Sequence, residues 1–379
     1  MTSKARQLAD LGGDTANLED ISSAYSSGAL SNRNKIINGA MTIDQRNAGA
    51  AISSPADQYT LDRWYSRQDG AGVASIQQST TAPAGFSSSL LATVTTADAS
   101  LASTDRYWLA QYIEGFNFSD TAFGTASAKA ITISFWVRSN LTGTFSGSIV
   151  NSALNRSYPF TYSISSADTW EQKSVTIAGD TTGTWVGGTN GIGLRVYFSL
   201  GSGSTYSGTA GAWAGARYEA ATGGANVMAT LSNTFYLTGV QLEAGDTATP
   251  FEHRSCGAEL ALCQRYFQSS FATGTAPATG LLICMYVTGT AYSTNNGTGL
   301  GTRFPVDMRS TPTIAYYPAS PASGSVGTVS VFSGGWANRP ATPHDSVSPT
   351  MQAFDINANG AFTVGPFMCQ YNYTVNAEL

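Results

Sequence analysis

Residues 131–138 read Ile-Thr-Ile-Ser-Phe-Trp-Val-Arg, and they give the clearest strand signal in the sequence. Alternation places Ile131, Ile133, Phe135 and Val137 on one face of a strand. Short runs of the same kind precede and follow this one, separated by Gly, Ser, Thr and Asn at 35–39, 41–44, 59–65, 89–94, 108–118, 145–150, 170–177, 193–200 and 234–242. Short strands joined by such loops indicate a mainly β chain with an antiparallel β-sandwich, which we place at residues 33–253.

A short helix is predicted in a linker at residues 254–269. Ser255 can cap its N-terminus, and an apolar stripe over 255–268 follows a 4-3-4 spacing formed by Cys256, Leu260, Cys263 and Phe267. A helix of about thirteen residues is marginal alone, so this stripe has to be covered. We predict that it packs against copies of itself. Packing on its own sandwich is the alternative.

Residues 270–379 return to short β runs, and we predict a second antiparallel, jelly-roll-like sandwich there. Seven of the 114 residues after Arg265 are charged, whereas fifteen are aromatic. Such a surface binds through aromatic faces and hydrogen bonds, or it packs against identical neighbours. Residues 1–32 hold too few large aliphatic residues for a core, so we predict an extended or short helical segment that orders only on a partner.

Charge and cysteine content exclude several functional classes. A net charge of −5 with only four lysines leaves no basic patch for nucleic acid. Four cysteines form no disulfide framework, and Cys256 and Cys263 would lie about 10 Å apart on a helix, too far for a bridge. The start resembles no signal peptide and no long apolar run occurs, which predicts synthesis in a cytoplasm without membrane insertion.

Catalysis has little support among the residues. Only His253 and His344 could serve a Ser-His-Asp triad; the first fits a hydrogen-bonded position at a domain junction better, and the second lies in a Pro-rich loop. The nearest approach to the paired carboxylates of a glycosidase is Asp168 and Glu171, which flank Trp170. Acids beside an aromatic residue are common where a strand starts. We therefore expect a non-enzymatic protein.

Tryptophans are the candidate sugar-binding residues, because an indole face stacks on the C–H-rich face of a sugar ring. Three lie in strand-like runs and are expected in the core: Trp64, Trp136 and Trp170. Trp185, Trp213 and Trp336 lie in Gly-rich loops and are expected to be exposed. Trp336 has Asn338 and Arg339 beside it to bond hydroxyls or carboxylates, so it is the best receptor candidate. A loop plug or an inter-subunit contact is an equal alternative for each.

Four segments occur in an order that resembles one protein family. They are Asn34–Arg46, Tyr59–Trp64, Phe235–Arg254 and Glu259–Phe267. Together they resemble the tail fibre or receptor-binding proteins of tailed bacteriophages that carry a carbohydrate-binding-module-like β-sandwich. Segments Phe304–Thr313 and Ala377–Leu379 resemble the C-terminal domains of the same proteins. Segment Ala5–Leu11 resembles their virion-attaching N-termini.

The resemblance implies a virion structural protein, usually a homotrimer. Residues 1–32 would attach to phage tail or capsid proteins, and the C-terminal domain would face a host-surface glycan or an outer-membrane receptor. Host lysis would release such a protein without a signal peptide. An adaptor, head fibre or capsid decoration protein that contacts only other virion proteins is the main alternative, and a free glycan-binding module is a third.

The same resemblance raises the question of a metal. Sandwich modules of this type often hold a structural calcium between their first and last strands, where Asn38, Asp44 and Glu243 fall. Calcium takes six to eight oxygen ligands, and these residues supply too few. A zinc site at His253 and Cys256 lacks a second ligand pair. We therefore predict no cofactor and keep calcium as an alternative.

Overall fold

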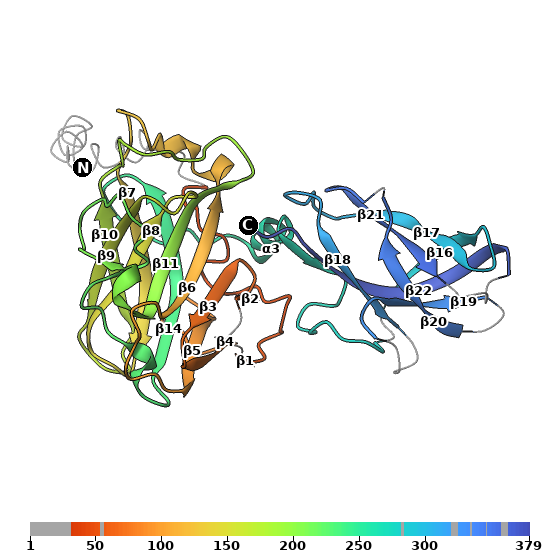
Figure 1. The fold of residues 1–379 in the computed structure, drawn as a ribbon, viewed down its shortest axis with the longest axis horizontal. Helices are drawn as coiled ribbons and strands as arrows, with labels where there is room; N and C mark the ends of the chain where they lie inside the picture. Colours follow the sequence, from red (N-terminus) through yellow and green to blue (C-terminus); the bar gives the residue numbers. More distant parts are fainter. Residues whose placement is uncertain are drawn as a thin grey trace, which may run out of the picture.

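The computed structural model describes residues 32–53, 57–281, 284–319, 325–333, 336–345, 347–357 and 363–379. The predicted attachment segment, residues 1–32, thus lies outside the described residues except for Asn32. The described chain is mainly β, as predicted. Figure 1 shows it as two β bodies, a larger N-terminal one and a smaller C-terminal one, with helix α3 (Cys256–Gln264) at their junction.

The N-terminal body is an antiparallel β-sandwich of two six-stranded sheets. Sheet A has the order β1 (Ile52–Ser53), β4 (Val73–Ser79), β5 (Ser89–Thr96), β14 (Thr234–Ala244), β7 (Ile131–Ser139), β10 (Glu171–Ile177). Sheet B has the order β2 (Gln58–Leu61), β3 (Trp64–Asp69), β6 (Arg106–Glu114), β11 (Ile192–Ser202), β8 (Gly143–Val150), β9 (Ser157–Ile164). Short 3₁₀ turns lie at η1 (Gly115–Asn117), η2 (Ser119–Thr121), η3 (Ser204–Tyr206) and η4 (Val227–Ala229).

The strand predicted at 131–138 is β7, and its alternation decides which side chains form the core. All four predicted inward residues, at 131, 133, 135 and 137, are fully buried. Phe135 crosses to sheet B, where its ring centroid lies 4.9 Å from that of Tyr162 and 5.0 Å from that of Phe198. The period-two prediction is confirmed for this strand, because one face of each sheet is buried against the other.

A long connection between β11 and β14 folds over the outer face of sheet B. Within it, β12 (Ser207–Gly208) pairs in parallel with β13 (Ala220–Ala221). The Ser148 hydroxyl of β8 donates to the main-chain oxygen of Tyr218 at 2.7 Å, and the Trp108 indole of β6 donates to Glu219 at 2.9 Å. This connection covers part of the outer face, including Trp108, whereas Tyr65 of β3 and Tyr112 of β6 stay half-buried.

The C-terminal body is a closed barrel and not the predicted jelly-roll-like sandwich. Its six strands run in the order β22 (Gly365–Asn376), β16 (Met285–Ala291), β17 (Asn296–Arg303), β21 (Met351–Asn357), β20 (Trp336–Pro343), β19 (Thr328–Phe332), and β19 pairs again with β22. The far half of β22 pairs with β15 (Phe267–Ser269) and β18 (Thr313–Pro318). Closure removes free sheet edges, which a sandwich retains.

Helix α3 is shorter than the predicted 255–268. Ser255 caps it as predicted, since its side chain accepts the N–H of Ala258 at 3.3 Å. Phe267 lies beyond the helix in β15, so the 4-3-4 stripe does not continue on one helical face. Leu260 and buried Cys263 pack with Ile37 and Ile43 of the sandwich. The second half of the helix is therefore covered within one chain, whereas Cys256 at its start is exposed.

The segment after β22 fastens the barrel to the sandwich. The Glu378 carboxylate forms ion pairs with Arg46, at 2.9 Å, and with buried Arg63. The Tyr59 hydroxyl donates to the main-chain oxygen of Leu379 at 3.0 Å. Arg309 of the barrel donates to the main-chain oxygen of sandwich residue 190 at 2.9 Å.

Among the described residues, no helix is long and apolar enough to cross a membrane.

Candidate functional site

The outer face of sheet B carries an array of aromatic rings, which we call the aromatic face: Tyr59, Tyr65, Trp108, Tyr112 and Tyr197. Strand alternation places them there. On β6, residues 107, 109 and 113 enter the core, so Trp108, Ala110 and Tyr112 point outward. On β3, Trp64 enters the core and Tyr65 points outward. Register sets Ala110 between Tyr65 and Tyr197, so one small residue separates large rings.

The rings of the aromatic face contact one another continuously. The centroid of Tyr65 lies 4.9 Å from that of Tyr59, 5.7 Å from that of Trp108 and 5.6 Å from that of Tyr112. Trp108 and Tyr197 are 4.7 Å apart and only 2% and 1% exposed. These two rings form a buried base. Tyr65 and Tyr112 are half-buried above it, so part of each side chain reaches solvent.

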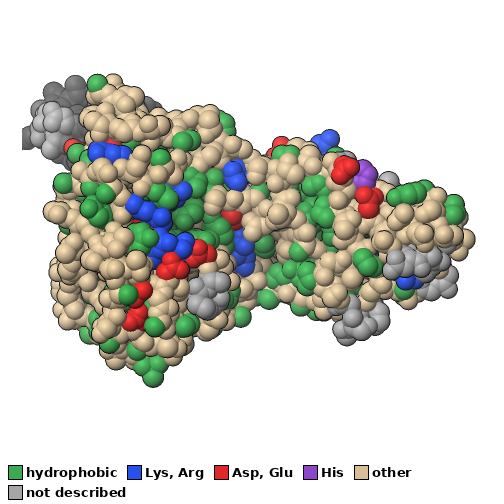
Figure 2. Space-filling view, in the orientation of Figure 1, with side chains coloured by type: hydrophobic (Ala, Val, Ile, Leu, Met, Phe, Trp, Pro, Cys, Tyr) green, Lys and Arg blue, Asp and Glu red, His purple; other side chains and the backbone are tan. Residues whose placement is uncertain are grey.

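A chain of alternating charges borders the aromatic face. Arg67 pairs with Asp57 and with Asp69, both at 2.7 Å. Asp69 also accepts from Arg106 at 2.9 Å, and Arg106 reaches buried Glu219 at 3.3 Å. Glu219 completes the chain with Arg217 at 2.5 Å. Figure 2 shows basic and acidic side chains in a band across this face, beside hydrophobic side chains.

The environment fixes the protonation of the groups on this face. Burial, followed by the negative charge of Asp57, raises the pKa of Tyr65 well above its ordinary value. Burial also raises the pKa of Tyr112, whose hydroxyl hydrogen-bonds Tyr197. Although burial raises the pKa of Asp69, hydrogen bonds from arginines 106 and 67 hold it below its ordinary value. At neutral pH the phenols are therefore neutral hydroxyls and this carboxyl is ionised.

A hydroxyl-lined hollow adjoins the aromatic face. Ser199 of β11 lies opposite Trp108 in register and forms one wall of a cavity of about 230 Å³. Other hydroxyls around it come from Ser146, Ser202, Ser204, Ser207 and Thr222. No charged side chain lines it among the described residues. The face thus offers ring surface, hydroxyls and charged groups side by side.

Trp185 and Trp213 are half-buried, so the prediction that they are exposed is wrong. Both rings pack edge-on against Phe123, at centroid distances of 5.0 and 5.7 Å, and they contact each other at 5.4 Å. The Trp185 indole donates to Asp180 at 3.1 Å, and that of Trp213 to the main-chain oxygen of Ala178 at 2.8 Å. They hold loops against the sandwich core, which is the loop-plug alternative left open by the sequence.

Trp336 is 42% exposed and opens strand β20 of the barrel. Its ring lies 5.4 Å from that of Phe332, its register partner on β19. Asn338 shares its face and accepts from the Ser330 hydroxyl at 2.7 Å, whereas alternation puts Arg339 on the opposite face with Val329. The proposed trio of Trp336, Asn338 and Arg339 is therefore split between two faces of one strand.

The exposed row around Trp336 is uncharged and crosses four strands in register. We call it the barrel row: Thr288, Met368, Phe332 and Trp336. Beside it, β16 pairs with β17 only at 289–291, and a register shift follows in β17. A shallow cavity of about 340 Å³ opens there, lined by Tyr286, Val287, Thr288, Gly301, Thr302 and Met368. Receptor binding at Trp336 stays a prediction.

The two histidines lie in different parts of the fold. His253 is exposed and packs against the rings of Phe86 and Phe251, at centroid distances of 5.2 and 4.9 Å, in place of the predicted hydrogen-bonded position. His344 lies 4.0 Å from Asp355 on the barrel. Asp355 also accepts from the Thr298 hydroxyl at 2.9 Å.

The carboxylates near Trp170 are also occupied. Asp168 pairs with Arg138 at 3.1 Å, and Glu171 pairs with Lys173 at 2.6 Å. Trp170 itself is half-buried on the outer side of sheet A, 5.9 Å from Tyr236, and Trp136 is likewise half-buried. Of the three tryptophans expected in the core, only that at position 64 is fully buried.

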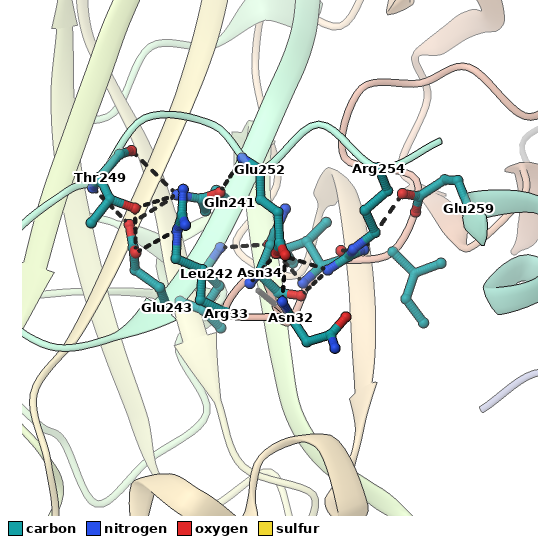
Figure 3. Close-up of polar contacts among 12 residues, drawn as sticks. Asn32, Arg33, Asn34, Gln241, Leu242, Glu243, Thr249, Glu252, Arg254 and Glu259 are labelled. Carbon is teal, nitrogen blue, oxygen red and sulfur yellow. Dashed lines mark hydrogen bonds and ion pairs between the residues drawn. The ribbon is translucent and has the colours of Figure 1, made fainter. Parts of the chain in front are cut away.

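The calcium candidates belong to separate hydrogen-bond networks. Glu243 accepts from Thr249 and from the Gln241 amide, at 2.7 and 3.0 Å, as Figure 3 shows. Asn38 bonds the main chain of residues 43 and 62, and Asp44 accepts the N–H groups of residues 46, 47 and 49. No group of three acidic, histidine or cysteine side chains suited to a metal occurs in the described ranges.

Figure 3 also shows why two of the family-like segments occur together. The Asn34 side chain accepts the N–H of Leu242 at 3.1 Å, and Glu252 accepts the N–H of Asn34 at 2.9 Å. The Gln241 side chain in turn accepts the N–H of Glu252 at 2.8 Å. Asn34 therefore ties the first described segment to β14 and to the approach to α3. Its role is structural.

Sequence reasoning missed the aromatic face, although a signal was present. In 108–113, Trp-Leu-Ala-Gln-Tyr-Ile, period two puts Trp108 and Tyr112 on one side and Leu109 and Ile113 on the other. Both sides are largely apolar, so the pattern alone does not say which faces outward. Pairing with Tyr65 of β3 decides it.

No protein-family model matches the sequence, and no curated protein matches it. Several solved structures are similar to part of it. One is the enzymatically active domain of bacteriophage CBA120 tailspike protein 4, at 12% identity and a TM-score of 0.31, covering 56% of this chain and 21% of that one. Another is the module TmCBM61 in complex with β-1,4-galactotriose, at 10% identity and a TM-score of 0.28. It covers 56% of this chain and 99% of that one.

A third is the family 11 carbohydrate-binding module of Clostridium thermocellum in complex with a β-1,3-1,4-mixed-linked tetrasaccharide, at 10% identity and a TM-score of 0.27. It covers 52% of this chain and 98% of that one. These neighbours are thus carbohydrate-binding modules and a phage tailspike domain. At such low similarity they carry no argument about ligands, so function has to be argued from the faces described above.

Proposed function

We propose that this chain is a non-enzymatic virion fibre protein of a tailed bacteriophage that binds a host-surface glycan through the aromatic face. The observation that carries glycan recognition is the pair Tyr65 and Tyr112, whose half-buried rings stand on a packed base and reach solvent. The virion role rests on the family-like segments of the sequence. Residues 1–32 are proposed to attach the protein to the particle.

The chemistry of the face suits a carbohydrate. Sugar rings combine C–H-rich faces, which stack on aromatic rings, with hydroxyls that need hydrogen-bond partners. Tyr65 and Tyr112 supply ring surface, while Asp57 and Arg67 lie within reach of Tyr65 and can bond hydroxyls. The buried base keeps the rings from collapsing inward, so little ordering is needed on binding.

The occupied carboxylates support a binding role over hydrolysis. A glycosidase needs one carboxyl with a raised pKa to act as an acid near a second carboxylate. On this face, hydrogen bonds from two arginines hold the pKa of Asp69 low, and Glu219 is buried between Arg106 and Arg217. We therefore assign these acids to holding arginines in place.

Tyr65→Ala and Tyr112→Ala test the proposal. Each should weaken glycan binding about tenfold, the scale of one lost aromatic stacking contact. Tyr236→Ala is the matched control, since Tyr236 is a half-buried tyrosine on the outer side of sheet A. Binding is measured by titration calorimetry with the best ligand from a glycan array, and folding by the melting temperature. Unchanged affinity in both tyrosine variants, with folding intact, would contradict the proposal.

A structural adaptor or capsid decoration protein is the second candidate, and the uncharged barrel row favours it. Such a row suits a protein neighbour, because no charge has to be desolvated when it is covered. Competition decides between the two functions. Purified protein that blocks phage adsorption to host cells supports receptor binding. Failure to compete, together with binding to isolated virion proteins, supports the adaptor.

A further inference from the structure

Arg195 occupies a distinct place on the outer face of sheet B. It lies on β11, in register with Tyr112 of β6 on one side and with Val150 of β8 on the other. Its guanidinium carbon is 5.2 Å from the centroid of the Tyr112 ring. Its Nη1 donates to the main-chain oxygens of Asn151 and Ser152, at 2.6 and 2.9 Å. The side chain is thus held beside one of the two half-buried rings.

Arg195 differs from the other arginines of this face in its charge balance. The other three (Arg67, Arg106 and Arg217) belong to the charge chain with Asp57, Asp69 and Glu219. Within the described part of the chain, no carboxylate lies within ion-pair distance of Arg195. Each arginine of the charge chain therefore has a carboxylate partner, whereas Arg195 has none among the described residues.

The unused edge of this guanidinium is open to a ligand. Nη1 is fixed by two carbonyl oxygens, while Nε and Nη2 have no protein partner in the described residues and are not among their buried unpaired atoms. These two N–H groups therefore reach solvent. They are parallel donors that match the two oxygens of a carboxylate. Because the side chain is already ordered by Tyr112 and the 151–152 carbonyls, binding an anion costs little further ordering.

We propose that Arg195 makes the aromatic face selective for an acidic glycan, by receiving a carboxylate, sulfate or phosphate of a sugar stacked on Tyr65 and Tyr112. This inference rests on the proposed function. A uronic-type carboxylate fits the two-pronged edge, and a sulfate or phosphate ester presents the same pair of acceptor oxygens. A neutral sugar would offer Arg195 no negative charge, so its guanidinium would interact with water alone.

The test uses the full chain on an array that holds each backbone in neutral, carboxylated, sulfated and phosphorylated forms. Wild-type protein should bind at least one acidic form about tenfold or more above its neutral counterpart, the scale of a charged hydrogen bond. The preference should shrink as salt rises from 50 to 500 mM, values chosen to shorten the Debye length from roughly 14 to 4 Å. Comparing the carboxylated, sulfated and phosphorylated forms identifies which acidic group the protein binds.

Arg195→Gln should remove the acidic preference and keep the affinity for the neutral form. Arg195→Lys should keep part of it, because the charge stays and the two-pronged edge is lost. Arg138→Gln is the matched control: Arg138 lies 5.0 Å from the Tyr236 ring on the other sheet. If Arg195 only ties down the 151–152 loop, Arg195→Gln lowers the melting temperature and keeps the acidic preference, which overturns the inference.

The remaining outcomes distinguish a failure of this inference from a failure of the proposed glycan-binding function. Wild-type binding to neutral glycans alone, still lost in Tyr65→Ala, overturns acid selectivity and leaves glycan binding standing. Binding to no glycan in any arm overturns both. If Arg195→Gln fails to fold, Arg195→Lys is measured in its place. A preference for acidic glycans that equals that of the wild type and does not change with salt also overturns the inference.

Discussion

Asp62 and Arg63 form the turn between β2 and β3, yet both side chains are buried. The Asp62 carboxylate accepts the N–H and the side-chain amide of Gln45, both at 2.7 Å. Arg63 donates to the main-chain oxygen of Tyr112 and pairs with Glu378. This turn belongs to one of the family-like segments. Its residues connect the sandwich to the region that fastens the barrel, which gives the segment a structural reason for its composition.

Burial gives Asp62 a measurable pH signature. Desolvation raises its pKa from 3.8 to about 6, against the opposing effects of Arg46 and the Gln45 hydrogen bonds. A carboxyl with a raised pKa in the folded state stabilises the protein below its unfolded pKa, and this contribution is lost as pH rises through 6. The free energy of unfolding should therefore rise by about 2 kcal/mol as pH falls from 7 to 4.5, a range that ends between the two pKa values.

Asp62→Asn checks this, since asparagine is neutral at every pH. Urea unfolding of the variant should give a nearly flat profile between pH 4.5 and 7. Asp120→Asn is the control, because Asp120 is exposed and pairs with Lys35 at the surface. The acids whose pKa is lowered, such as Glu114 and Asp180, weaken the fold only at more acidic pH. A variant with the wild-type slope would exclude Asp62 as its source.

At the scale of elements, the strands were predictable, but the closure of the C-terminal strands into a barrel was not. Alternation in 131–138 identified β7 because one side of that strand meets an apolar core and the other does not. The barrel depends on β19 pairing with β22, for example Ser330 with Gln370, forty positions along the chain. Local patterns in a barrel strand and in a sandwich strand are the same, so sequence cannot distinguish the two architectures.

The site was predictable to a smaller degree than the fold. Gly-rich surroundings predicted exposed indoles at Trp185 and Trp213, but both rings gain more from packing on Phe123 than from exposure to water. Trp336 has no such partner in the core and stays exposed. The aromatic face unites residues of β2, β3, β6 and β11, and only the sheet order brings these strands together.

The segment after β22 supports a prediction about stability. Glu378→Ala should lower the free energy of unfolding by about 3–5 kcal/mol, because Arg63 would remain buried without a carboxylate. Glu171→Ala is the control: it leaves Lys173, which is more exposed than Arg63, without its carboxylate and should cost about 1 kcal/mol. Urea denaturation at pH 7 measures both. Equal losses in the two variants would show that the Arg63 pair contributes no more than a surface ion pair.

For the whole molecule, the central question is how many copies assemble. The resemblance implies a homotrimer, and the sequence assigned part of the contact to α3. Leu260 now lies against Ile37 and Ile43 of its own sandwich, so the helix has less apolar surface to offer a neighbour. The barrel row remains uncovered and uncharged. We therefore expect a trimer whose contacts lie on the barrel.

Sedimentation equilibrium of the full chain and three variants tests this expectation. Phe332→Glu places a charge in the barrel row, where the ring is 38% exposed, and should shift trimer to monomer with little change in melting temperature. Tyr292→Glu is the control, an equally drastic change at an exposed ring outside the row. Leu260→Glu should lower the melting temperature and keep the trimer, since its cost falls on packing within one chain. A monomeric wild-type chain would reject the trimer altogether. A trimer that is lost only in Leu260→Glu would show that the subunits contact each other through helix α3.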